Sequence, residues 1–197
     1  MTLLPVLLNW PLILLPIHIA FLELIIDPAS SVVFEAEPAD PNVMRRPPRH
    51  SREPLFTRGQ LSVNLLQGTS ILIIVMLIYI GATYYGQTEN QARTMAFTTL
   101  VIANLSLILS GRSQDTLISS PPKSNRALWY VAGAAVIFLA CALYIPALRS
   151  VFLFAPLSAT AIIASAAAGL SSLVLFEALK ITLRSSPKKK NGGSISA

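Results

Sequence analysis

Charge and cysteine are both scarce in this chain of 197 residues. Charged side chains make up 12% of the sequence, about half of their share in an ordinary soluble domain. This shortage excludes a water-soluble or disordered protein. Cys141 is the only cysteine, so the chain holds neither an internal disulfide nor a cysteine-based metal cluster. No Lys or Arg precedes Arg45, and because a signal peptide needs a basic start, we expect none here.

Hydrophobic residues, in contrast, make up 53% of the chain and are gathered into long uninterrupted blocks. A helix needs about 20 mostly apolar residues to cross the hydrocarbon core of a bilayer. Four blocks meet or nearly meet this length, so the sequence predicts an all-α, polytopic transmembrane helix bundle that lies in the lipid bilayer. The four expected spans are residues 61–82, 94–110, 127–148 and 158–183.

The opening stretch, residues 1–34, is too long for one straight spanning helix and contains Pro5, Pro11 and Pro16. We expect a helix remnant and a bend, followed by a spanning helix from about Leu15 to Phe34. This gives about five full spans plus an N-terminal remnant. The expected segments are the remnant and bend at 1–11, a spanning helix at 12–34, a cytoplasmic Pro/Arg-rich loop at 35–60, a four-helix membrane bundle at 61–183 and a basic disordered cytoplasmic tail at 184–197.

The basic residues predict the orientation. Thirteen of the fifteen Lys and Arg lie between the first and second spans, between the third and fourth, or at and after the end of the last. Basic residues near span ends stay on the cytoplasmic side, so we expect the N-terminus outside and the C-terminus in the cytoplasm, with the plasma membrane as the location. This distribution explains the net charge of +6 without a nucleic-acid partner.

Glu23 and Asp27 are acidic residues inside an expected span, where an ionisable group is costly unless it is paired or bound to an ion. Their i, i+4 spacing places both carboxylates on one face of the helix. Pro28 cannot donate to the carbonyl of Leu24, which frees an oxygen beside them. The alternative is pairing with a neighbouring helix, but basic residues within the spans occur only near the end of the last one. We therefore favour a bound cation or proton.

Other polar residues in the spans have simpler interpretations. Glu177 stands three residues before Lys180, and an ion pair between them explains both charges. His18 lies off the face of Glu23 and is expected to pack at an interface. Asn104, in the third span, is either a hydrogen-bonding contact between helices or a neutral oxygen ligand. The small residues of 161–172 predict close packing of the last helix.

Several motifs together resemble a known family. The sequence reads LPIHIAFLELIID at 15–27, FEAEP at 34–38 and MRRPPR at 44–49. In order and spacing these are similar to the sixth membrane helix and the following loop of cation-transporting P-type ATPases, especially calcium pumps. The run TMAFTTLV at 94–101 looks like the start of the family's eighth membrane helix. The resemblance covers essentially the whole chain, from the end of the fifth membrane helix to the tenth.

The resemblance implies an intramembrane cation site. Calcium pumps bind the ion with an Asn and an Asp four residues apart on the sixth helix; Asp27 matches the Asp, and Glu23 stands at the position of the Asn. The calcium-binding acid of the eighth helix corresponds to Asn104. The implied metal ligands are therefore Glu23, Asp27 and Asn104. Calcium, another divalent cation and a proton all remain open as the transported ion.

The family's Asp-Lys-Thr-Gly phosphorylation motif is missing from the sequence, and so is a soluble region that could bind ATP. We therefore expect no enzyme activity and no cofactor in this chain, with ATP and magnesium acting only in a missing N-terminal part, its expected partner. The alternative is a stand-alone membrane subunit, passive pathway or regulator derived from such a pump. Met1 lies within what resembles the end of the fifth helix. This favours the hypothesis that the chain is the C-terminal membrane portion of a pump. An upstream reading frame that carries the motif would decide between them.

Overall fold

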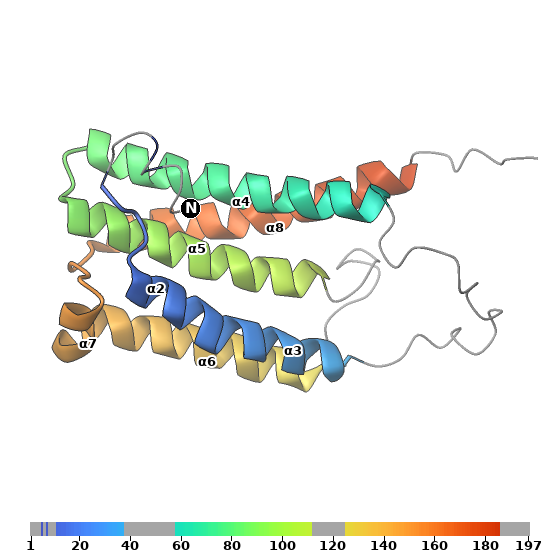
Figure 1. Cartoon of the computed structure of the whole chain (residues 1–197), viewed down its shortest axis with the longest axis horizontal. Coiled ribbons are helices and arrows are strands. Elements are labelled where there is room, and N and C mark those ends of the chain that lie inside the picture. Colours follow the sequence, from blue (N-terminus) through green and yellow to red (C-terminus); the bar gives the residue numbers. More distant parts are fainter. Residues whose placement is uncertain (1–4, 6, 8–10, 38–57, 112–124, 186–197) are drawn as a thin grey trace, which may run out of the picture.

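The computed structural model describes residues 5, 7, 11–37, 58–111 and 125–185. Over these ranges the regular elements are helical, which confirms the all-α class. Four long helices lie side by side along the long axis of the molecule, together with the shorter helices of the opening stretch (Figure 1). The long helices are α4 (Arg58–Tyr84), α5 (Glu89–Gly111), α6 (Arg126–Tyr144) and α8 (Ala159–Ser185).

Each of these four helices contains a segment long and apolar enough to cross a membrane. Many large hydrophobic side chains on them are exposed, among them Leu77 at 63% and Val174 at 71%. An outward apolar surface of this kind suits lipid as the solvent, so the multi-pass membrane architecture is confirmed. The candidate spans are Leu61–Tyr84, Glu89–Gly111, Arg126–Tyr144 and Ala159–Ile181.

The third long helix is shorter than predicted. The apolar pattern favours a helix over 127–148, but α6 ends at Tyr144 and a separate short helix, α7 (Pro146–Val151), follows. Ile145 has an extended backbone, with φ −80° and ψ 117°. A residue before proline is disfavoured in the helical region because its backbone meets the proline ring. The prediction was therefore wrong after Tyr144, where Pro146 overrides the hydrophobic pattern.

The opening stretch contains three consecutive elements: α2 (Pro16–Phe21), a π-helix η1 (Leu22–Ile26) and α3 (Asp27–Glu35). Helical backbone thus covers nearly the expected range, but the π segment, which was not predicted, divides it. Pro28 lies in the first turn of α3, and because proline has no N–H, it cannot continue the regular i to i−4 ladder. The change of helix type falls where the proline was expected to disturb the helix.

The expected segment boundaries need small corrections. Helix α4 already begins at Arg58, inside the predicted loop 35–60, and α8 continues to Ser185, inside the predicted tail 184–197. Most of the predicted remnant at 1–11, most of that loop and the rest of the tail lie outside the described residues.

Helix α5 is the centre of the bundle and packs against α4, α6 and α8. Its contact with α8 uses small and hydroxyl residues. The Thr99 hydroxyl lies 3.2 Å from the carbonyl oxygen of Ser165, and the Ser106 hydroxyl lies 3.5 Å from that of Gly169. Ser165 is fully buried. The predicted close packing of the last helix through its small residues is confirmed, because only short side chains let two helix backbones approach in this way.

Gly169 is a point of close approach between α5 and α8. A Cβ atom at this position would lie 2.7 Å from Cβ of Ile102 and 3.0 Å from the carbonyl oxygen of Thr99. Both of those atoms are on or next to the backbone of α5, so neither can rotate away. The glycine therefore sets the distance between α5 and α8.

We expect Gly169→Ala to lower the free energy of unfolding by about 1–3 kcal/mol, since an added methyl group overpacks the contact. Gly133→Ala is the matched control, because a Cβ there meets nothing within 4 Å. That variant should raise stability by about 0.5–1 kcal/mol through helix propensity. Denaturant titration in detergent micelles, followed by circular dichroism, measures both. An equal increase in the free energy of unfolding of Gly169→Ala and Gly133→Ala would contradict the close contact at Gly169.

Candidate cation site in the opening helix

Glu23 lies in the π segment η1, and Asp27 is the first residue of α3. Both side chains are exposed on the outside of the bundle. Their sequence neighbours on the same stretch include the buried apolar residues Phe21 and Ile26. The two carboxylates thus stand on an outward face of a helix whose other side packs into the apolar core.

The backbone between the carboxylates departs from the α-helix. A π segment inside a helix is rare and often marks a functional position. The carbonyl of Asp27 accepts hydrogen bonds from the hydroxyls of Ser30, at 2.7 Å, and Ser31, at 3.3 Å. These serines add oxygen-bearing side chains to the stretch just after the carboxylates. Carboxylate, carbonyl and hydroxyl oxygens are ligands suited to hard cations.

Asn104 lies on the side of α5 that contacts the opening helix. It follows Phe97 by seven residues, or about two helical turns, and the Phe97 ring centroid lies 5.5 Å from that of Phe21 in α2. Near the other end of α5, a Cβ on Gly111 would lie 3.8 Å from Cζ of Phe34 in α3. The two helices therefore run in the same direction, as Figure 1 also shows.

The two contacts between α5 and the opening helix indicate how far along the bundle each candidate ligand lies. Asn104 lies seven residues after Phe97, and Asp27 lies six residues after its contact partner Phe21. Asp27 lies about midway between Phe21 and Phe34, and Asn104 lies midway between their contact partners Phe97 and Gly111, so the two residues are at nearly the same level. Asn104 is half-buried. Within the described ranges no group of three or more His, Cys, Asp or Glu side chains could hold a metal ion, so Glu23 and Asp27 do not complete a metal site with other such side chains of these ranges.

Arg93 holds the segment that leads into the opening helix. It is 6% exposed, and its guanidinium donates to the carbonyl of Leu12 through Nε at 3.3 Å and Nη2 at 3.2 Å. An ion pair with Glu89, at 2.6 Å, and a bond to Asn90 complete its surroundings. Arg93 lies just before the expected span 94–110, whereas the structure places it within α5. A buried guanidinium needs such partners, since an unpaired buried charge is costly.

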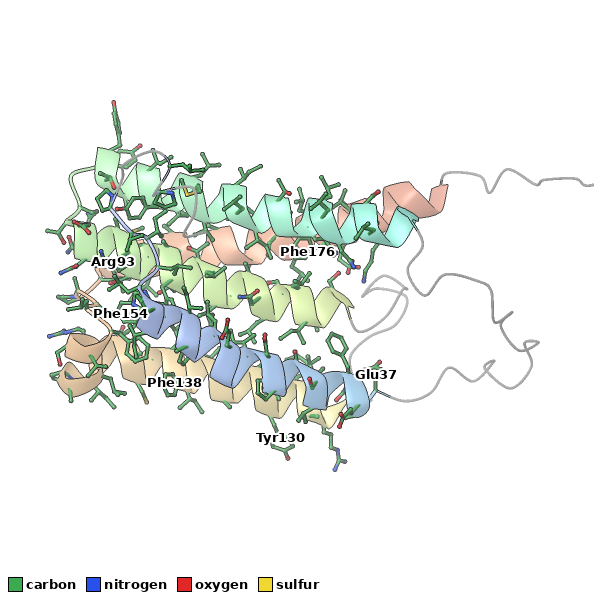
Figure 2. All side chains as sticks on the ribbon, viewed as in Figure 1. Glu37, Arg93, Tyr130, Phe138, Phe154 and Phe176 are labelled. Atoms are coloured by element: carbon green, nitrogen blue, oxygen red, sulfur yellow. The ribbon has the colours of Figure 1, made fainter. Side chains whose placement is uncertain are left out.

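His18 anchors α2 to the segment after α7. It is fully buried; its Nδ1 accepts from the Leu15 amide at 3.2 Å, and Nε2 lies 2.8 Å from the carbonyl oxygen of Phe152. A neutral imidazole with its proton on Nε2 satisfies both bonds. The ring stacks on Phe154, with centroids 5.0 Å apart. His18 is thus a packing residue, as expected. Figure 2 shows Arg93 and Phe154 close to the same end of the bundle.

Asn125 holds the other end of the opening helix. It is 1% exposed, and its side-chain amide donates to the carbonyl of Val33 at 2.9 Å and to Glu37 at 2.8 Å. Its side-chain oxygen accepts from the Leu128 amide and caps the N-terminus of α6. Sequence reasoning missed this residue, although an Asn just before an apolar run is a known helix-start signal.

The third acidic residue within the expected spans is part of a contact between helices. Glu177 pairs with Lys180 at 3.1 Å, which confirms the predicted ion pair. The Ser110 hydroxyl donates to Glu177 at 2.9 Å, and Lys180 donates to the Ser110 carbonyl. These bonds join the ends of α5 and α8.

Comparison with known proteins adds an independent finding. The family described as "Cation transporting ATPase, C-terminus" matches residues 11–182. The chain belongs to this family. It is 29% identical over 171 residues to calcium-transporting ATPase 1 of Yarrowia lipolytica. This match covers 86% of this chain and 18% of the relative. The calcium-transporting ATPase of Bacillus subtilis is 30% identical over 148 residues, 74% of this chain and 16% of the relative.

The mouse calcium-transporting ATPase type 2C member 1 is 26% identical over 193 residues, 97% of this chain and 21% of the relative. The chain therefore spans about a fifth of the length of the curated relatives it matches. It is a C-terminal membrane domain of a cation-transporting P-type ATPase, and the family's catalytic domains lie outside the match. The predicted family membership is confirmed.

Asn125→Ala should destabilise the domain by about 1–3 kcal/mol, because it removes a helix cap and leaves a buried carbonyl unpaired. Asn125→Ser should fall between this variant and the parent, since serine keeps the cap but is too short to reach α3. Thermal unfolding in detergent measures the series. A serine variant no more stable than the alanine variant would contradict the capping role.

Proposed function

We propose that this domain forms the C-terminal part of the ion pathway of a P-type cation pump, and that Glu23, Asp27 and Asn104 supply part of its intramembrane cation site. The observation that carries the proposal is the pair of exposed carboxylates on a π-distorted helix, level with an amide of the neighbouring helix. A cation between such groups offsets their mutual repulsion.

The exposure of the Glu23 and Asp27 carboxylates supports a second part of the pump that packs over them. An ionised group facing hydrocarbon costs several kcal/mol, and the opening helix is anchored near both ends, by His18 and by Asn125. Its orientation is therefore a property of the packed domain, and the carboxylates need a cover from outside it. We infer that the N-terminal part of the pump provides this cover and the remaining ligands.

The opening helix is long enough to be the fifth span. Helical backbone runs from Pro16 to Glu35 through three consecutive elements, and about 20 residues at 1.5 Å each match the hydrocarbon thickness. We adopt the orientation predicted from the basic residues, in which the beginning of α6 and the end of α8 are on the cytoplasmic side. With this orientation Glu23 and Asp27 lie within the membrane, between the outer bend and the cytoplasmic loop.

Calcium is the transported ion that we propose first. The candidate ligands are oxygen atoms, which hard divalent cations prefer, and the relatives described above are named calcium-transporting ATPases. Another divalent cation or a proton would use the same carboxylates. The chemistry of ATP and magnesium belongs to the N-terminal part of the pump, so the domain alone does not hydrolyse ATP.

Glu23→Gln and Asp27→Asn test the site in a pump reassembled from this chain and the N-terminal part of a calcium-pump relative. Each variant should abolish calcium-dependent phosphorylation by ATP while the protein still accumulates in membranes, because the charge that attracts the ion is lost. Glu35→Gln is the matched control, since Glu35 is an exposed acid at the end of α3. Unchanged calcium dependence in both site variants would reject the assignment.

Two substitutions of Asn104 distinguish a role as an ion ligand from a role as a structural contact between helices. If its amide oxygen binds the ion, Asn104→Asp should keep or raise the apparent calcium affinity, and Asn104→Leu should lower it at least tenfold. If the amide only joins helices, Asn104→Leu should instead lower the unfolding temperature of the isolated domain without calcium. Phosphorylation titrated with calcium and thermal unfolding in detergent give the two readouts.

A further inference from the structure

A concave surface lies between α5, α6 and α8. It is a groove of about 270 Å³ with an almost wholly apolar wall. The Ser106 hydroxyl at its edge is already bonded to the carbonyl of Ile102 at 2.9 Å. A group that enters the groove therefore finds hydrocarbon contacts and little hydrogen bonding. Its lining includes Ile102, Leu105, Leu109, Ala132, Val136 and Leu170.

The groove is separate from the candidate cation site. Successive residues of an α-helix are rotated by about 100°, so Leu105 and Leu109 point well away from the direction of Asn104. Ile102, which also lines the groove, faces α8 at Gly169. Ile108, one turn after Asn104, forms the near edge of the groove, but none of the candidate ligands Glu23, Asp27 and Asn104 lines it.

Position in the membrane indicates what fills the groove. All three bordering helices contain candidate spans, so the medium around the groove is lipid hydrocarbon. Its lining on α6 extends from Leu128 to Val136, and on α5 from Ile102 to Leu109. These ranges belong to the half of the bundle where α6 begins and α5 ends, which our orientation assigns to the cytoplasmic leaflet.

Side chains suited to a lipid head group lie at and beside the cytoplasmic end of the groove. Trp129 lines the groove and is 61% exposed, and tryptophan favours the level of the head groups. Arg126 does not itself line the groove but is exposed one turn earlier on α6, three residues before Trp129. Figure 2 shows Tyr130, the residue after Trp129, pointing away from the bundle. A guanidinium beside an indole attracts a negatively charged phosphate group at this level.

We propose that this groove binds one acyl chain of an anionic phospholipid from the cytoplasmic leaflet, with the lipid's phosphate group at Arg126. The apolar wall accommodates the chain, and the charge of Arg126 selects the head group. The site requires the membrane orientation proposed above but is independent of the ion ligands. Loss of lipid binding and loss of ion binding are therefore separate results.

Tryptophan quenching by brominated lipid tests the site directly. The chain has two tryptophans, so Trp10→Phe leaves Trp129 as the sole reporter. The full chain is placed in phosphatidylcholine nanodiscs that contain a minor fraction of phosphatidylserine or phosphatidylcholine with dibrominated chains. We expect brominated phosphatidylserine to associate about fivefold more strongly, the effect of one basic side chain near an anionic lipid.

Two further variants separate the head group from the acyl chain. Arg126→Gln should remove the preference for phosphatidylserine while chain contact remains. Ala132→Phe should fill the groove and reduce quenching by both lipids, measured relative to nanodiscs without bromine. Ala134→Phe is the matched control, because Ala134 is exposed and outside the groove lining.

Other outcomes would overturn the proposal. Equal association of the two lipids in the parent would show ordinary boundary lipid only. Quenching that is unchanged by Ala132→Phe would place the lipid elsewhere. Co-purification of a small membrane protein that Ala132→Phe displaces, without enrichment of phosphatidylserine, would assign the groove to a protein partner. Circular dichroism confirms that each variant is folded, and Arg126→Gln, at an exposed site, tests the preference without altering the packing.

Discussion

A charged or hydrogen-bonding group inside an apolar bundle needs a partner, and most of this structure follows from that constraint. Arg93 meets it through the Leu12 carbonyl and Glu89, and Lys180 meets it through Glu177. The bond from Arg93 to Leu12 also joins α5 to the segment before α2, and a bond from Lys180 to the Ser110 carbonyl joins α8 to α5. The few polar groups of the chain therefore determine where its elements are joined, and the apolar residues fill the space between them.

Glu23 and Asp27 differ from these satisfied groups, since both are exposed and neither has an ion-pair partner among the described residues. The helix that carries them is anchored by His18 toward one end and by Asn125 toward the other. Its middle is a π segment. A rigid support around a locally altered helix, with charge presented outward, is the arrangement expected of one wall of an ion site whose other wall belongs to another part of the pump.

The contact between α5 and α8 provides the scaffold for both proposed sites. Gly169 lets the two backbones approach closely, which leaves α5 in the centre of the bundle. One side of α5 then presents Asn104 toward the opening helix, and another borders the groove with Leu105 and Leu109. Because α8 packs so closely on α5 while α6 makes fewer contacts with it, space remains between α6 and α8 for a lipid chain.

The sequence by itself determined the membrane class, the four long spans, the pairing of Glu177 with Lys180 and the family, because these depend on composition, local spacing or a linear motif. The end of α6 was mispredicted, since apolar periodicity continues through Pro146. Only the tertiary structure decided that Arg93 is buried, that Asn125 joins α3 to α6, and that Asn104 lies level with Asp27. These facts depend on which helices pack together and at what height, and no local pattern in a single chain specifies that.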